Sequence, residues 1–521
     1  MAPTSAESPI RVAFVPGHVT GLPGRIGMTL APGKRDGNWQ RDLDLDLGRL
    51  REVFHTDLLV SLIEAEERNM LGLKALPERA RAHGLELAEL PIEDGQVPES
   101  RADLDAMVLR MLDAAATGRN VVAHCRGGLG RAGTLVAACL CARGAPAEAA
   151  MQTVRRVRPG AIETAEQEAL IHALATGAAP ALPVSFARFR GCLLGGAIGD
   201  ALGYPIEFDS HASIIARWGQ TPPDPLAYAD TAPAVVSDDT QMTLFTGEGL
   251  IAAPASPVEG IRRAYLRWFA TQVDVEMPPG GWLSGVPRLN ARRAPGNTCL
   301  SALHAQRGAP EHPTVSTPPN DSKGCGAIMR SAPIGLGAAS REQAFALGRD
   351  AGVLTHGHPS GYLSAAYFAA LIHDLSRERP LEGAMQAADV LLAAEAGAEE
   401  TQRFIALARE VARGGSPSAA ALEGLGGGGW TGESALAIAL ACVLAPDPTF
   451  AATLWRAVAH GGDSDSTGSL VGNLLGAARG DAELPPRWLA ELELREEIET
   501  IASDLYDRAV LGARMDADKY G

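Results

Sequence analysis

The first third of the chain alternates short apolar runs with longer stretches of helical periodicity. Four runs have the composition of strands: residues 11–15, 57–63, 85–90 and 120–123. Helical patterns lie between them, the most regular at residues 101–116. Strands that alternate with helices are typical of α/β domains with a mostly parallel sheet. We therefore predict an α/β domain over residues 1–177.

Beyond this region the pattern changes to one helix after another, with Gly/Pro-rich loops and few strand signals. A stretch of small residues and prolines, 176–183, separates the two regions. We predict a linker over residues 178–184 and an all-α domain over residues 185–521. The longest uncharged apolar run, 435–445, is too short to span a bilayer and predicts a buried helix.

Two series of glycines recur at every fourth position of the predicted all-α domain. They are Gly191, Gly195, Gly199 and Gly203, and Gly468, Gly472, Gly476 and Gly480. A glycine inside a helix costs about 0.5–1 kcal/mol relative to alanine, so neither series suits an isolated helix. Helix faces without side chains allow a neighbouring helix to approach closely. We predict two tightly packed helices, one ending near Glu207 and one beginning at Asp463.

Carboxylates are concentrated at two places in the same domain. Asp463 and Asp465 lie in a glycine-lined turn, and Asp238 and Asp239 lie far upstream. The predicted helix pair would bring these four side chains to Glu207, and five clustered carboxylates indicate a hard divalent cation. Taken singly, each motif is equally compatible with a helix N-cap and an acidic first turn.

Composition narrows the function classes. The 521 residues carry a formal net charge of -16, which argues against general nucleic-acid binding through phosphate neutralisation. Seven cysteines spread over this length do not form a disulfide framework and favour a reducing compartment. The N-terminus lacks the positive start and apolar core of a signal peptide. We expect a soluble, cytoplasmic protein.

A second candidate site lies in the α/β domain, where a glycine-rich loop joins a predicted strand to a helical stretch. Such a loop presents backbone N–H groups and a positive helix end to an anion. Cys125 at its start is expected to be a thiolate. Arg131 at its end offers planar bidentate donors for phosphate oxygens. The residues between them are predicted to bind phosphate: Arg126, Gly127, Gly128, Leu129 and Gly130.

This arrangement predicts a phosphoryl-transfer site that needs no metal. The alternative, a buried structural cysteine, describes Cys139 and Cys141 better than Cys125. A general acid is needed for the leaving oxygen, and Asp94 lies on a loop after a predicted strand, with Glu93 as its competitor. Gln167 could position the water for a second step.

The α/β domain resembles cysteine-dependent phosphatases of the dual-specificity class, in particular the cyclin-dependent kinase inhibitor 3 type. The resemblance rests on Cys-x5-Arg, the Asp94 loop and the segment 160–167, and implies an α/β cysteine-phosphatase-like fold without a cofactor. It also implies that Cys125 is the nucleophile, Arg131 the phosphate binder and Asp94 the acid and then the base. Ala132 departs from the family, which usually has Ser or Thr there; Thr134 lies two residues on.

The second domain resembles the ADP-ribosylglycohydrolase family. Six segments match in order: 189–207, 237–240, 294–298, 323–330, 355–356 and 462–466. The resemblance implies an all-α fold, two Mg²⁺ ions (or Mn²⁺) and cleavage of an ADP-ribosyl N- or O-glycosidic bond. It places Glu207 with the metal ligands Ser237, Asp238, Asp239, Asp463, Asp465 and Ser466.

The same resemblance places five residues near the substrate: Gly324, Cys325, Gly326, Arg330 and His356. Cys325 could equally be a small packing residue. His356 and His358 lack partners with the spacing of a zinc site, so a loop or wall role is favoured.

Together these features predict a bifunctional hydrolase, a phosphatase joined to an ADP-ribosylglycohydrolase. The expected partners are an ADP-ribosylated protein or small ADP-ribose derivative and a phosphorylated protein or small molecule, with neither nucleic acid nor membrane. Two alternatives stay open. Both domains could process one phosphorylated ADP-ribose derivative, or one domain could be a silent phosphate- or ADP-ribose-binding module.

Overall fold

The computed structural model describes residues 2–175, 184–223, 234–447 and 449–520. The chain divides into two compact units, Met1–Pro183 with Val510–Lys519, and Val184–Ala509 with Tyr520–Gly521. The predicted linker lies outside the described residues apart from Val184, so the predicted domain boundaries stay a prediction.

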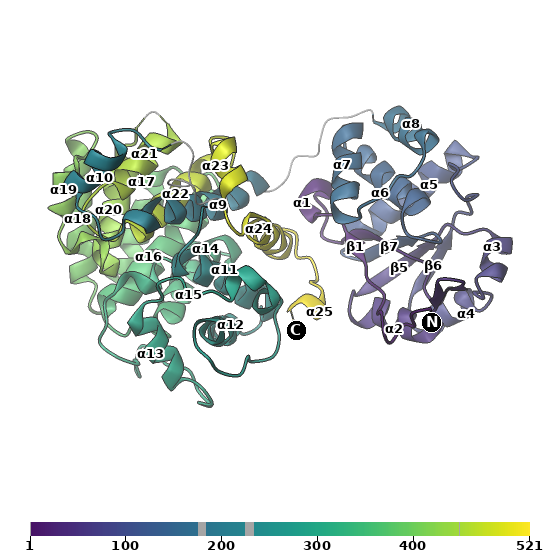
Figure 1. The fold of residues 1–521 in the computed structure, drawn as a ribbon, viewed down its shortest axis with the longest axis horizontal. Coiled ribbons are helices and arrows are strands. Elements are labelled where there is room, and N and C mark those ends of the chain that lie inside the picture. Colours follow the sequence, from purple (N-terminus) through teal and green to yellow (C-terminus); the bar gives the residue numbers. More distant parts are fainter. Residues whose placement is uncertain (1, 176–183, 224–233, 448, 521) are drawn as a thin grey trace. The chain divides into compact units, whose positions relative to one another are not determined.

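The first unit is built around a sheet of the order β1-β2-β7-β5-β6 (Figure 1). Its described elements are β1 (Ala13–Phe14), α1 (Gly17–Thr20), β2 (Ile26–Thr29), β3 (Arg35–Asp36), β4 (Trp39–Gln40), α2 (Leu43–Glu52), β5 (Thr56–Ser61), α3 (Ala65–Met70), α4 (Leu76–Ala82), β6 (Glu86–Glu89), α5 (Arg101–Ala116), β7 (Asn120–His124), α6 (Gly130–Ala142), α7 (Ala147–Val157) and α8 (Ala165–Leu174). Within this sheet β1 is antiparallel to β2 and the other pairs are parallel, while β3 and β4 form a separate antiparallel pair. The predicted α/β class is confirmed.

Strand β2 was not among the predicted strands. Gly27 interrupts its apolar pattern because β1 lies very close: a Cβ atom there would lie 2.7 Å from the Phe14 ring and 2.9 Å from the Ala13 carbonyl oxygen. The short β3–β4 pair was also missed. Strand β2 is completed by its pairing with the distant β7, whereas β3 and β4 form a local hairpin of two-residue strands, too short to give a pattern in the sequence.

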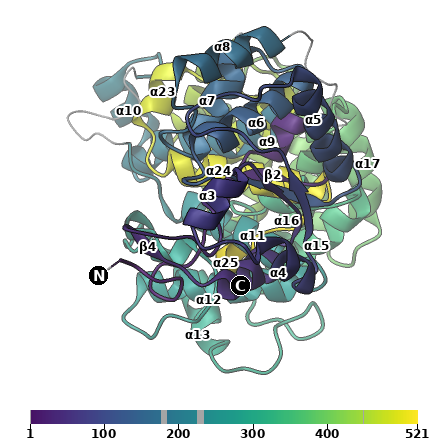
Figure 2. The same ribbon diagram turned by 90° about the vertical axis from the view of Figure 1, so that its right-hand side faces the viewer.

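Both faces of this sheet are covered, which explains the apolar strands. Leu58 and Val60 of β5 join a core with α5, α6, α7 and α8, whereas Leu59 joins a second core with α2 and α4. Figure 1 shows these two groups of helices on opposite faces, and Figure 2 shows α5 to α8 on the side of the unit away from α4. Because β7 is parallel to its neighbours β2 and β5, the loop after β7 lies at the carboxyl edge of the sheet, the usual place for a ligand in parallel sheets.

Apart from isolated β-bridges, the regular elements in the described residues of the second unit are helices, which confirms the predicted all-α class. Its elements are α9 (Phe186–Gly203), η1 (Tyr204–Ile206), α10 (His211–Trp218), α11 (Asp238–Ala252), α12 (Pro257–Gln272), η2 (Leu283–Gly285), η3 (Pro287–Leu289), α13 (Asn297–Ala305), η4 (Cys325–Ala327), α14 (Ala332–Gly337), α15 (Arg341–Val353), α16 (Pro359–Ser376), α17 (Leu381–Ala393), α18 (Glu399–Arg413), α19 (Ala419–Glu423), η5 (Gly427–Gly429), α20 (Gly432–Leu444), α21 (Phe450–Val458), α22 (Ser464–Arg479), α23 (Pro486–Glu491) and α24 (Arg495–Ala509). The last helix, α25 (Ala517–Tyr520), falls in the C-terminal segment that belongs to the first unit up to Lys519.

Helices α9 and α22 pack antiparallel, backbone against backbone, as the glycine series predicted. A Cβ atom at Gly195 would lie 2.4 Å from the carbonyl oxygen of Gly472, and one at Gly199 would lie 2.0 Å from that of Gly468. At Gly203 the carbonyl oxygen of Ser464 would be 2.2 Å away. Side chains at these positions would force the helices apart.

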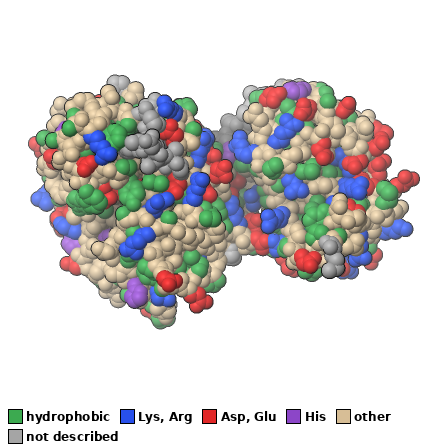
Figure 3. Space-filling view, viewed as in Figure 1, with side chains coloured by type: hydrophobic (Ala, Val, Ile, Leu, Met, Phe, Trp, Pro, Cys, Tyr) green, Lys and Arg blue, Asp and Glu red, His purple; other side chains and the backbone are tan. Residues whose placement is uncertain are grey.

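The surface and the cysteines add little to the fold. Acidic and basic side chains are interspersed over the face shown in Figure 3. All seven cysteines lie in the described residues and are free thiols. In the described ranges, no helix is long and apolar enough to cross a membrane.

We expect Gly199→Ala to destabilise the second unit, because the new methyl group would meet backbone that cannot move aside. Overpacking of this kind typically costs about 1–3 kcal/mol. Gly383→Ala is the matched control, because the nearest atom to its Cβ position is the Arg379 Cγ, 3.8 Å away; it should be neutral or stabilising by up to about 1 kcal/mol. Equal thermal midpoints for the two variants would contradict the packing argument.

Candidate active sites

The glycine-rich loop of the first unit begins where β7 ends and leads into α6. Cys125 is only 3% exposed. Gly128 has a φ of +68°, and a Cβ atom there would lie 2.3 Å from the Thr29 carbonyl group. Glycine is therefore required both for the conformation and for the packing of the loop against the end of β2.

The peptide groups of this loop share one orientation, with their carbonyl groups hydrogen-bonded to the rest of the unit and their N–H groups left without an acceptor in the described part of the chain. The carbonyl oxygens of Arg126, Gly127 and Gly128 each accept a hydrogen bond from elsewhere in the unit. Within the described residues, the N–H groups of these three residues and of Leu129 donate to no protein acceptor. The loop thus offers four adjacent N–H donors beside the N-terminus of α6, an arrangement suited to an anion.

Arg131 closes the loop and is 1% exposed. Its Nη1 donates to Glu67 Oε2 at 2.7 Å and to the Ile92 carbonyl oxygen at 2.8 Å, and its Nη2 donates to Glu67 Oε1 at 3.0 Å and to Asp94 Oδ1 at 2.8 Å. The buried Nε has no partner. This leaves one guanidinium donor for a ligand and fixes the plane of the group through Glu67.

Sequence reasoning missed Glu67. Its only trace in the sequence is its place in the acidic run Glu64, Glu66 and Glu67 after β5. The burial that distinguishes Glu67 is visible only in the structure. Asp94, the predicted acid, reaches the site through Arg131 and keeps a side chain that is 64% exposed. The structure thus brings Cys125, Arg131 and Asp94 together on the loops that follow the strands.

Gln167 packs against the end of the loop, where a Cβ atom at Gly130 would lie 3.1 Å from its amide group. Its Oε1 accepts from the Glu163 N–H at 2.9 Å, and its Nε2 donates to the Gln96 carbonyl oxygen at 3.3 Å. Glu163, which sequence reasoning did not select, reaches the loop itself, since its Oε2 accepts from the Gly130 N–H at 2.7 Å. Its signal was its place in the same 160–167 segment.

The position after Arg131 carries no hydroxyl group, because it is Ala132. The Thr134 hydroxyl donates to the Gly130 carbonyl oxygen at 2.8 Å, a bond within the turn of its own helix. Its proton is therefore already used in α6. The neighbouring His124 is fully buried, and burial lowers its pKa to about 4, so that it is neutral at pH 7.

The second candidate site lies at the end of the α9–α22 pair. One carboxylate oxygen from each of Glu207, Asp463 and Asp465 lies within 4.8 Å of the others. Glu207 follows η1 at the end of α9, and Asp463 is the N-cap of α22, where its carboxylate accepts from the Ser466 N–H at 3.4 Å. The close helix packing therefore brings three of the five predicted carboxylates together.

Asp238 and Asp239 begin α11 beside this cluster. Ser237 is the N-cap, as its Oγ accepts from the Asp239 N–H at 3.2 Å. The Asp239 Oδ2 is buried without a partner. Asp200, to which sequence reasoning gave no role, is fully buried and accepts from the Ser237 N–H at 2.9 Å and the Thr240 hydroxyl at 2.5 Å. It ties the start of α11 to α9.

The electrostatics of this cluster are unfavourable without a cation. Burial, and then the Asp465 carboxylate, raise the pKa values of Asp238, Asp239 and Asp463 well above the ordinary value. The same causes raise the pKa of Asp200 to about 7 and that of Glu207 to about 8. The all-oxygen donor set, including the unpartnered Asp239 oxygen, fits hard divalent cations.

The predicted substrate residues fall into two groups. The Cys325 thiol donates to Asp463 Oδ2 at 2.9 Å, so that it lies at the acidic cluster, where Ser466 Oγ is 3.7 Å from its sulfur. Gly324 and Gly326 pack on the His356 ring, and a Cβ atom at Gly326 would lie 2.8 Å from it.

Arg330 and His356 lie deeper. The Arg330 guanidinium is 1% exposed, donates to the Thr355 hydroxyl at 2.6 Å and lies over the Tyr265 ring. Burial lowers the pKa of His356 to about 3, so that the ring is neutral. Both residues are buried in the protein behind the segment of Cys325. Contact of either residue with a substrate stays a prediction.

Two family models match the chain. Residues 181–513 match the model described as ADP-ribosylglycohydrolase, and residues 59–171 match that of the "Swiss Army Knife protein, DSP-PTPase phosphatase domain". These matches confirm both resemblances and the assignment of the two hydrolase types.

Individual relatives agree with the first model. The chain is 26% identical to the ADP-ribosyl-[dinitrogen reductase] glycohydrolase of Rhodospirillum rubrum, over 60% of this chain and 92% of the relative. It is also 26% identical to the ADP-ribosylhydrolase ARH3 of Bos taurus, over 62% of this chain and 93% of the relative.

Among solved structures, a kinase-associated phosphatase with serine in place of its catalytic-site cysteine is 21% identical to this chain. The match covers 32% of this chain and 94% of that chain, with a TM-score of 0.31.

The raised pKa values predict how stability depends on pH. The folded cluster binds protons that the unfolded chain releases, so its contribution is present below about pH 4 and is lost as pH rises through about 7–8. In EDTA, the thermal midpoint of the second unit should fall between pH 5 and pH 8, and Mg²⁺ should restore it most at pH 8.

Asp239→Asn should flatten this pH dependence and remove the response to Mg²⁺, because it takes away one of the crowded charges. Glu410→Gln, which changes an exposed carboxylate on α18, is the control and should behave like the unaltered protein. A midpoint in EDTA that rises toward pH 8, or one indifferent to Mg²⁺, would argue against a cation site.

Proposed function

Because this chain belongs to the ADP-ribosylglycohydrolase family over residues 181–513 and matches a dual-specificity phosphatase domain over residues 59–171, we propose that it is a bifunctional hydrolase with one active site in each unit. The first site hydrolyses phosphate monoesters through a phosphocysteine. The second cleaves ADP-ribosyl glycosidic bonds with the help of Mg²⁺ or Mn²⁺. The free thiols support a reducing compartment such as the cytoplasm.

The observation that carries the phosphatase proposal is the set of unpaired N–H groups from Arg126 to Leu129 with the unpartnered Nε of Arg131. These donors surround the place where a phosphate bound to Cys125 would lie. The Cys125 thiolate attacks phosphorus, and the P–O bond to the leaving group breaks as Asp94 gives that oxygen a proton. Water then attacks phosphorus, the P–S bond breaks, and Asp94 takes the proton from the water.

For the second step we propose that Gln167 acts through Glu163. Gln167 holds the Glu163 backbone, and the Glu163 carboxylate lies at the loop, where it can orient the water. Sulfur must leave as a thiolate in this step. Ala132 offers no hydroxyl to stabilise it, and the Thr134 proton is engaged with Gly130.

The observation that carries the glycohydrolase proposal is the crowding of Glu207, Asp463 and Asp465 next to Asp238 and Asp239. These carboxylates, with Ser237 and Ser466, would hold two divalent cations. The ions would supply positive charge that binds the ribose hydroxyls and makes a water more acidic. The buried carboxylates orient the substrate and accept the proton of the attacking water, while Cys325 and its glycine neighbours form the adjoining wall.

The two activities should be separable. EDTA or Asp465→Ala should abolish release of ADP-ribose while phosphate release continues, because the acidic cluster found among the described residues lies in the second unit. Cys125→Ser should abolish phosphate release, and Arg131→Lys should strongly reduce it. ADP-ribose release should continue in both variants. Assays with a phosphotyrosine peptide, a mono-ADP-ribosylated protein and ADP-ribose-1″-phosphate measure both. Parallel loss of both activities in every variant would refute two independent sites.

The absence of a hydroxyl at Ala132 predicts slow hydrolysis of the phosphocysteine. One well-placed donor to a developing anion is worth up to about 3–4 kcal/mol. Stopped-flow assays should therefore show a burst of leaving group close to one equivalent per site before slow turnover. Ala132→Ser should speed turnover and shrink the accumulated intermediate, with little change in burst rate. A linear time course from the start, unaffected by Ala132→Ser, would mean that another group assists the thiolate.

A further inference from the structure

Lys34 is a buried cation beside the nucleophile that the proposed mechanism does not use. Its side chain is 8% exposed, and its Nζ donates to the Arg126 carbonyl oxygen at 3.2 Å. The Asp36 carboxylate is 3.8 Å away, and the Trp39 ring centroid is 5.7 Å away. A buried ammonium group with so little neutralisation is costly, so its place against the loop calls for an explanation.

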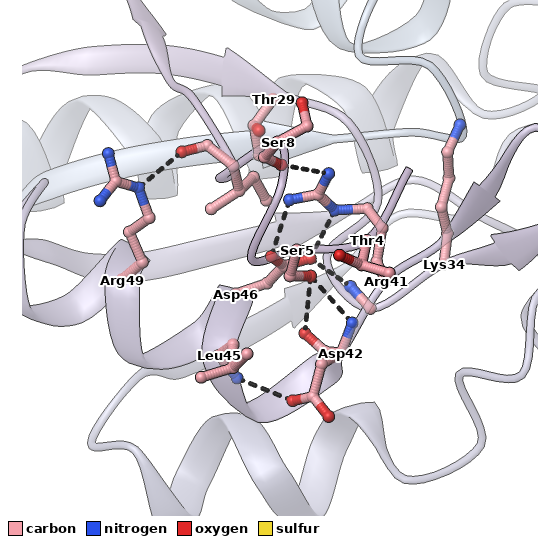
Figure 4. A network of polar contacts seen from close by, with 12 residues as sticks. Thr4, Ser5, Ser8, Thr29, Lys34, Arg41, Asp42, Leu45, Asp46 and Arg49 are labelled. Carbon is pink, nitrogen blue, oxygen red and sulfur yellow. Dashed lines mark hydrogen bonds and ion pairs between the residues drawn. The ribbon is translucent and has the colours of Figure 1, made fainter. Parts of the chain in front are cut away.

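A rigid frame holds Lys34 in this position. Arg41 and Asp46, each 1% exposed, form a bidentate ion pair with distances of 2.7 and 2.8 Å. Asp46 Oδ2 accepts from the Gly33 N–H at 2.8 Å, and the Arg41 N–H donates to the Lys34 carbonyl oxygen at 3.1 Å. Figure 4 shows Lys34 extending away from this pair. The backbone on both sides of Lys34 is therefore fixed.

A second cation continues the same pattern along the loop. Arg158 Nη2 donates to the Gly127 carbonyl oxygen at 2.9 Å, and its Nε donates to that of Gly128 at 3.2 Å. Lys34 and Arg158 together thus bind three consecutive carbonyl groups from outside the loop.

Carbonyl direction determines N–H direction in this loop. In a planar trans peptide, the C=O of one residue and the N–H of the next point in opposite directions. Carbonyl groups held outward at Arg126, Gly127 and Gly128 therefore turn the N–H groups of Gly127, Gly128 and Leu129 inward. These are three of the four N–H groups that lack a protein acceptor in the described residues.

We propose that Lys34 is a positioning residue of the phosphatase site: with Arg158 it holds the loop carbonyls outward, so that the N–H groups face the phosphate, and it places a fixed positive charge near the Cys125 sulfur. This inference rests on the proposed phosphatase function. Burial lowers the pKa of Lys34, while the charges of Asp36 and the Cys125 thiolate act in the opposite direction. The attraction is mutual, so Lys34 favours the thiolate.

The test uses the full-length protein and the variant Lys34→Met. The rate of Cys125 alkylation by iodoacetamide is followed against pH by peptide mass spectrometry, and orthovanadate is the anion probe. We expect the alkylation midpoint to rise by about half to one pH unit, as for loss of a nearby charge. Orthovanadate binding and kcat/KM should each weaken about tenfold, as for loss of a charged hydrogen bond. Lys74→Met, which alters an exposed lysine, should change neither quantity.

Lys34→Arg keeps a cation and should hold the alkylation midpoint near that of the unaltered protein. A merely structural lysine would lower the thermal midpoint of Lys34→Met and leave its alkylation midpoint and orthovanadate affinity unchanged, a result that overturns the proposal. Should Lys34→Met not fold, Arg158→Met removes the other cation from a partly exposed position. Unaltered orthovanadate affinity in Arg158→Met would overturn the proposal as well.

Failure of the underlying function gives a different result. In that case the unaltered protein shows no phosphate release that depends on Cys125. The alkylation profile and orthovanadate binding need no turnover, so they still report whether Lys34 acts on the loop.

Discussion

The contact between bare backbones of α9 and α22 is the constraint on which the second unit depends. Carbonyl oxygens of one helix occupy the space where side chains of the other would be, at Gly195, Gly199 and Gly203. This packing places Glu207 against Asp463 and Asp465. Close packing of the two backbones thus holds carboxylates at distances that they would otherwise avoid, and a bound cation would relieve the repulsion.

The first unit solves the opposite electrostatic problem. In the proposed function its loop binds an anion, and the groups suited to that are N–H groups, a helix N-terminus and the guanidinium of Arg131. Here too the backbone is decisive, because Gly128 permits both the left-handed conformation and the contact with Thr29. Glu67 fixes the plane of Arg131, and Lys34 and Arg158 fix the carbonyl groups, so the donors are oriented before a ligand binds.

Much of the fold and of the sites could be predicted from local sequence. The helix at 101–116 and the strands β5, β6 and β7 were predictable because their periodicity is local. So were Cys125 and Arg131, since a nucleophile and an arginine at fixed spacing share one loop. The glycine series even gave a long-range contact, because a repeat of four residues has meaning only when another backbone fills the groove.

The remaining features were decided by the tertiary structure alone. Glu67 lies 64 residues from its partner Arg131, and Asp200 lies 37 residues from Ser237. Glu67 stands in an acidic run that is typical of a surface helix, and Asp200 is the single acid of the apolar helix α9, so neither sequence context identifies the partner that gives the acid its role. Lys34 reads as part of a polar turn until the sheet brings it to a loop 92 residues away. The sequence by itself determined which groups are the candidates for the chemistry; the packing of distant segments decided which other groups orient them, because burial and hydrogen-bond partners exist only in the folded chain.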